Sequence, residues 1–86
     1  MPGVDNAFPA LRVDVVKNDA PNYTVLIRNN SDGRLQVIMR STSAQSWSAQ
    51  DTHEERLVLG PQEQASFLVA LNTRQVKVVA AYPLGR

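Results

Sequence analysis

Apolar and polar residues alternate along most of the chain with a period of two. The segment Leu11–Val16 reads LRVDVV, in which leucine and valines alternate with arginine and aspartate. This alternation is typical of a β-strand with one buried and one solvent-exposed face. The same reasoning predicts further strands at 23–28, 35–40, 56–59, 65–71 and 76–82. No stretch has the periodicity of an amphipathic helix, so the pattern predicts an all-β chain.

Clusters of turn-forming residues separate the predicted strands. They lie at NDAPN (18–22), NNSDGR (29–34), Gly60-Pro61 and 72–74. The dipeptide Asp32-Gly33 is the strongest signal, because both residue types accept the backbone conformations of tight turns. We therefore expect it to close a hairpin between 23–28 and 35–40.

Two segments lack the alternation. Residues 41–55 read STSAQSWSAQDTHEE, which predicts a polar loop interrupted by Trp47. Residues 1–10 contain two prolines and a glycine, which predicts an irregular N-terminal arm. The remaining residues, 11–86, are expected to form one domain.

About six short strands, separated by turns roughly every 8–12 residues, are typical of a sandwich or small barrel. We predict a small antiparallel β-sandwich, with a jelly roll or small β-barrel as the alternative. The segments TVLIRNNSDGRLQVIMR (24–40), LVLGPQEQASFLVAL (57–71) and VKVVAAY (76–82) carry a resemblance to generic immunoglobulin-like β-sandwich domains of bacteria and their phages. The resemblance implies a fold class and no functional residue. The cysteine pair of antibody-type domains is absent.

Composition narrows the means of stabilisation. The 86 residues include no cysteine and one histidine, His53, which excludes disulfides and a zinc site of the usual Cys/His type. Small domains bury a small share of their surface, so packing, oligomerisation or docking onto a partner must stabilise this one. The formal net charge of +1 argues against a nucleic-acid-binding protein, which usually shows a basic excess.

No set of residues predicts catalysis. The glycines are too far apart for a phosphate-binding loop. His53 would have to be the base, but it lies in the predicted loop beside Glu54 and Glu55, which we interpret as surface charge. Asn29 to Asp32 offer oxygen atoms to calcium, but a turn explains all four. We therefore expect a non-enzymatic protein without cofactor or metal.

Five residues are candidates for an interface. Trp47 is either a lid on one end of the sandwich or an exposed anchor, for instance a platform for stacking sugars. Phe8 either packs on the core or reaches a neighbouring subunit with the arm. Arg12, Arg28 and Arg40 all point outward in the predicted strands, where they would form a basic row suited to an acidic protein surface.

The leading hypothesis is an accessory subunit of a larger assembly such as a phage virion, for instance a capsid decoration protein. The expected partner is a protein or a second copy of the chain. The alternative is an appended carbohydrate- or protein-binding domain of an extracellular enzyme or adhesin. A third possibility is an oligonucleotide-binding barrel. We found no secretion signal and no apolar run long enough to span a membrane, so a virion or bacterial cytoplasm is favoured.

Overall fold

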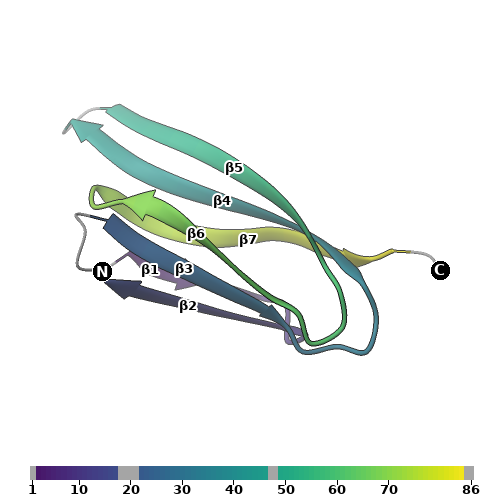
Figure 1. The fold of residues 1–86 in the computed structure, drawn as a ribbon. Helices are drawn as coiled ribbons and strands as arrows, with labels where there is room; N and C mark the ends of the chain where they lie inside the picture. Colours follow the sequence, from purple (N-terminus) through teal and green to yellow (C-terminus); the bar gives the residue numbers. More distant parts are fainter. Residues whose placement is uncertain (1, 18–21, 47–48, 85–86) are drawn as a thin grey trace.

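The computed structural model describes residues 2–17, 22–46 and 49–84, and every regular element in these ranges is a β-strand (Figure 1). The strands are β1 (Gly3–Asp5), β2 (Leu11–Lys17), β3 (Asn22–Asn29), β4 (Leu35–Ser46), β5 (Ala49–Leu59), β6 (Gln64–Ala70) and β7 (Thr73–Pro83).

The strands form two packed sheets. The four-stranded sheet has the order β1-β7-β4-β5, and the three-stranded sheet has the order β2-β3-β6. Every pairing is antiparallel except that of β1 with β7, which is parallel. The predicted β-sandwich is confirmed. Both sheets keep open edges, so the molecule is not a closed barrel.

The core lies between the sheets and follows the alternation in the sequence. In β3, for example, Val25 and Ile27 are buried while Leu26 and Arg28 face outward. The buried apolar residues are Leu11, Val15, Val25, Ile27, Leu35, Val37, Met39, Leu59, Val69, Val76 and Val78. β-Branched side chains dominate because they pack well on a pleated surface.

The turn at Asp32-Gly33 does not close a hairpin, so that prediction is wrong. β3 belongs to the three-stranded sheet and β4 to the four-stranded sheet, so the chain crosses between layers here. Gly33 does not adopt a positive φ. The sequence predicted that the chain reverses, but both a hairpin and a crossover present alternating strands to the same core. The partner strand is therefore decided by the packing of the sheets.

The Asn29 side chain hydrogen-bonds both this β3–β4 crossover and the β5–β6 crossover. Its side chain is fully buried, and Nδ2 donates to the carbonyl oxygens of Gly33 (2.8 Å), Leu59 (3.1 Å) and Gly60 (3.0 Å). Its Oδ1 accepts from the Ser31 amide at 2.9 Å. Gly33 lies in the β3–β4 connection, and Gly60 begins the β5–β6 connection, which also crosses between the sheets. One buried amide therefore joins both crossovers.

The predicted polar loop at 41–55 is mostly strand. β4 continues to Ser46 and β5 begins at Ala49, with Ser41 opposite His53 and Ser43 opposite Asp51. β4 also pairs with β7 as far as Ser43. Backbone pairing on both sides makes the strand here, although the side chains carry no alternation of polarity. Trp47 lies outside the described residues.

The N-terminal arm was predicted to be irregular, and this is wrong for Gly3–Asp5, which forms strand β1. Residues Gly3 to Asp5 pair in parallel with Gln75 to Lys77 of β7. After β1, the Asn6 side chain accepts from the Phe8 amide at 3.0 Å and donates to the Leu11 carbonyl at 2.9 Å. Backbone pairing at a sheet edge needs no particular side chains, so the composition of the arm gave no sign of this strand.

Candidate functional site

The outer face of the three-stranded sheet contains two of the predicted interface residues. The outward side chains form three rows across β2, β3 and β6, which are Arg12–Arg28–Gln64, Asp14–Leu26–Ser66 and Val16–Thr24–Leu68. The first row is basic and the third is mainly apolar. We call this surface the Arg12–Leu68 face.

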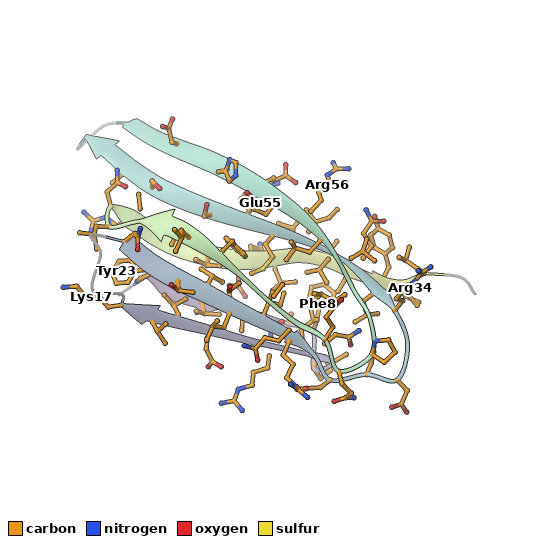
Figure 2. The ribbon with its side chains drawn as sticks, viewed as in Figure 1. Phe8, Lys17, Tyr23, Arg34, Glu55 and Arg56 are labelled. Carbon is orange, nitrogen blue, oxygen red and sulfur yellow. The ribbon has the colours of Figure 1, made fainter. Side chains whose placement is uncertain are left out.

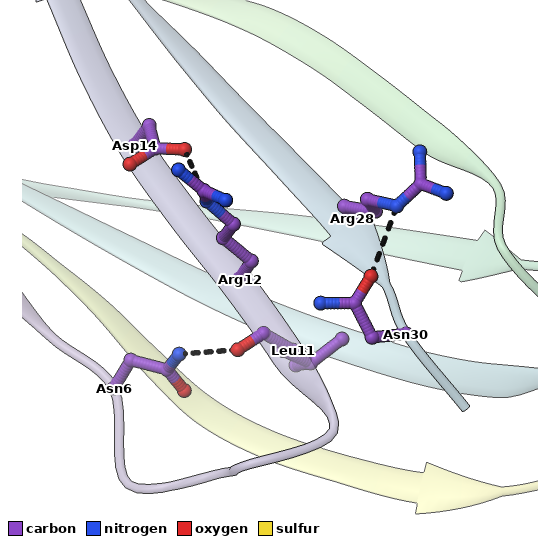
Figure 3. A network of polar contacts seen from close by, with 6 residues as sticks. All are labelled: Asn6, Leu11, Arg12, Asp14, Arg28 and Asn30. Atoms are coloured by element: carbon purple, nitrogen blue, oxygen red, sulfur yellow. Dashed lines mark hydrogen bonds and ion pairs between the residues drawn. The ribbon is translucent and has the colours of Figure 1, made fainter.

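The two arginines of the basic row lie directly opposite each other in the β2–β3 register. Figure 3 shows how each is held: Arg12 Nε donates to Asp14 Oδ2 at 3.0 Å, and Arg28 Nε donates to Asn30 Oδ1 at 2.9 Å. Arg28 also reaches Gln62 Oε1 at 3.4 Å. Among the described residues, Arg28 thus has neutral partners and no ion pair.

Like charges that face each other across a strand pair are destabilising. Arg12 is paired with Asp14, whereas Arg28 forms no ion pair within the described ranges. A depression of about 410 Å³ lies beside the two guanidinium groups and is also lined by Asp14, Leu26 and Gln64. A carboxylate from outside the chain would fit this charge and geometry, because the guanidinium fork bonds carboxylates strongly.

The apolar row of the same face is well exposed. Leu68 is 63% exposed and Val16 is 42% exposed, and Thr24 lies between them in the register. A single exposed apolar side chain is ordinary, but two in one row beside a basic row resemble the mixed surface of a protein interface.

The third arginine of the predicted row is elsewhere. Arg40 lies on β4 in the four-stranded sheet, where it is opposite Glu54 of β5 and Lys77 of β7. The prediction that the three arginines form one row is therefore wrong, because the outer faces of the two sheets point in opposite directions. The outward direction of Arg40 was predicted correctly, but the β3–β4 crossover places this residue in the other sheet.

The remaining interface candidates are not on the Arg12–Leu68 face. Phe8 is half-buried and packs against the core of its own chain. Figure 2 shows Phe8 toward the Arg34 end of the sandwich, with Lys17 and Tyr23 at the opposite end. Its expected role in contacts between subunits stays a prediction, as does that of Trp47.

A second concave surface lies between the inner face of β5 and the edge of β6. This depression, which we call the β5–β6 cleft, has a volume of about 250 Å³. It is lined by Ser41, Ser43, Asp51, His53, Leu68, Val69, Ala70, Asn72 and Thr73. Hydrogen bonds connect its polar residues across β4 and the start of β7. Ser43 Oγ and Thr73 Oγ1 are 3.2 Å apart, and Asn72 Nδ2 donates to the Ala44 carbonyl at 2.8 Å.

His53 takes part in the cleft and not in a loop. It lies on the inner face of β5, is 70% exposed, and bonds Glu55 Oε1 through Nε2 at 2.7 Å. Glu54 and Glu55 point to opposite faces, as expected for neighbours on a strand, and Glu54 lies opposite Arg40. Within the described ranges, no three His, Cys, Asp or Glu residues are grouped so as to hold a metal ion.

Sequence reasoning missed the β5–β6 cleft entirely. The available signal was the loss of apolar residues after Met39, which was interpreted as a loop and not as a strand with a polar inner face. The cleft depends on which strands are neighbours, and the sequence pattern does not specify that.

Comparison of the chain with protein-family models, with curated proteins and with solved structures finds no match. In the part of the chain that the structure describes, no helix has the length and apolar character required to cross a bilayer.

Proposed function

We propose that the chain is a non-enzymatic interaction module that docks onto an acidic protein surface through the Arg12–Leu68 face. The observation that carries the proposal is the direct opposition of Arg12 and Arg28 beside an exposed apolar row. A local cost in stability is expected at functional positions, because natural sequences otherwise avoid such conflicts.

The assembly that we favour is a larger one, such as a phage virion, with this chain as an accessory subunit. A small sandwich, an arginine-rich set of charges and the lack of a recognisable catalytic set in the sequence support this choice. The alternative of a carbohydrate-binding domain depended on Trp47, which lies outside the described residues, so no structural observation favours it.

A capped tetraglutamate peptide is a suitable probe of the proposed face. In an NMR titration at low salt, we expect shifts at the amides of Arg12, Arg28 and Gln64. Arg28→Gln should weaken binding about threefold to fivefold, as expected for a partly exposed charge pair. The same variant should unfold at a slightly higher urea concentration, because it removes the repulsion between the arginines.

Arg74→Gln is the matched control, since Arg74 is an exposed arginine at the start of β7. It removes the same charge from a different surface and should leave peptide binding unchanged. If it weakens binding as much as Arg28→Gln does, the attraction reflects net charge and the proposed face is wrong.

Native mass spectrometry at micromolar concentration tests the second partner that we expected, a further copy of the chain. A closed ring of subunits would mean that the chain assembles with itself. A monomer would direct the search to a separate acidic partner, as the Arg12–Leu68 face predicts.

A further inference from the structure

We propose that the β5–β6 cleft accepts an extended segment of a protein partner, which adds to the edge of β6 as a fourth strand of the smaller sheet and carries a lysine or arginine toward Asp51 and His53. This site differs from the Arg12–Leu68 face, although Leu68 lines both surfaces. The extended segment pairs with the backbone of β6, and its cation faces the opposite side of the sheet. Four observations support it.

First, the sandwich has a vacant strand position. The sheets contain four and three strands, and the edge strands β1 and β2 contact each other across the layers. At the opposite edge, β5 therefore has no strand of the smaller sheet across from it. The inner face of β5 shows this directly. His53 and Glu55 point inward, yet their side chains are 70% and 40% exposed. No described strand covers that part of β5.

Second, the edge beside the vacancy has no protection by charge. β6 reads QASFLVA and has no charged residue over its seven positions. The other long edge strands differ, because β2 contains Arg12, Asp14 and Lys17, and β5 contains several acids and Arg56. Charged side chains on an edge discourage pairing with other chains, and their absence leaves β6 open to strand addition.

Third, the geometry selects a single strand as the occupant. A strand added to β6 would lie about 4.8 Å further along the sheet, under β5. A second copy pairing through its own β6 would bring its β4 into the space that β5 already occupies. The overhanging β5 therefore blocks a whole sandwich and leaves room for an isolated extended segment.

Fourth, the cleft has a charge that selects its occupant. Its lining includes Asp51 and His53 but no lysine or arginine, and Glu55 follows on the same face of β5. Toward the other end of β5, the inner face becomes apolar at Leu57 and Leu59. The complementary segment has small or apolar inward residues along most of its length and a cation at the end near Asp51.

The test uses the whole chain and capped seven-residue peptides of alternating valine and threonine. One inward position near an end is lysine or, in the matched peptide, glutamate. Each peptide is made in two versions, with the charged residue near the N-terminus or near the C-terminus. Titration at low salt is followed by the NMR shifts of backbone amides. We expect shifts along β6 and at Asp51 and His53, with the lysine peptide of one version binding at least about threefold tighter than its glutamate counterpart.

Two controls separate strand pairing from simple charge attraction. Asp51→Asn should reduce the preference for lysine, whereas Glu54→Gln, on the outer face of the same strand, should leave it unchanged. Two further peptides are N-methylated at alternate backbone nitrogens, one at the odd and one at the even positions. Only one of them loses the N–H groups that face β6, so one methylated peptide should lose binding and the other should keep it.

Several results would overturn the proposal. They are the absence of shifts at millimolar peptide, shifts confined to the β2 and β3 residues of the Arg12–Leu68 face, and equal binding of the two methylated peptides. Binding by a second whole copy, detected as a dimer paired through β6, would also contradict it.

Discussion

The β4–β5 hairpin has two halves that share one backbone pattern and differ in what their inner faces contain. In the crossover half, Leu35 and Val37 of β4 lie opposite Leu59 and Leu57 of β5. In the tip half, the inner face carries Ser41 and Ser43 opposite His53 and Asp51. The backbone ladder runs through both halves, but only the first is part of the apolar core.

The difference shows that strand formation and core formation are separate outcomes in this protein. The crossover half is held by burial, and Val37 and Leu59 are almost inaccessible to solvent. The tip half is held by pairing of β4 with β5 and β7 and by polar contacts such as that between Ser43 and Thr73. In the described part of the chain, no buried side-chain polar atom lacks a hydrogen-bond partner.

The largest effect that distinguishes the halves is expected from Leu59→Ala. Leu59 is 2% exposed, and truncation would leave a cavity in the crossover half, at a cost of about 3 kcal/mol in the free energy of unfolding. Urea denaturation would measure it. Val58→Ala is the control on the same strand, because Val58 is 54% exposed on the outer face and should cost below about 1 kcal/mol. Equal losses would mean that the crossover half is not the core.

A somewhat smaller effect is expected from Asn29→Ala, which tests the hydrogen bonds between the Asn29 side chain and the two crossovers. The substitution removes the side-chain donor to the carbonyl oxygens of Gly33, Leu59 and Gly60, which belong to both crossovers, and we expect a loss of about 2 kcal/mol. Asn30→Ala is the matched control. Within the described residues that exposed side chain bonds only Arg28, so its removal should change stability by less than about 0.5 kcal/mol. A near-neutral Asn29→Ala would show that the crossovers are held by packing alone.

The smallest effect is expected in the tip half, from Ser43→Ala. This change removes one hydroxyl contact, between Ser43 and Thr73, from an open cleft, and should cost below about 1 kcal/mol. Thermal unfolding followed by circular dichroism is sufficient to compare it with Leu59→Ala. A loss as large as that of Leu59→Ala would remove the distinction between the two halves.

The sequence by itself determined the strands whose residues alternate, and with them the fold class. Leu11–Lys17 and Asn22–Asn29 were predictable because alternation states which side chains must avoid water. It also determined that Arg12, Arg28 and Arg40 face outward. These are local properties, since a strand's period of two fixes the face of each residue without reference to any neighbour.

Only the tertiary structure decided which strands are neighbours, and the candidate surfaces depend on that. The pairing of β2 with β3 brings Arg12 opposite Arg28, while the crossover at Asp32-Gly33 sends Arg40 to the other sheet. The β5–β6 cleft exists because one sheet is a strand wider than the other. Every residue type except proline offers the same backbone donor and acceptor, so the sequence pattern cannot specify strand partners, and the packing of two sheets around one core must select them.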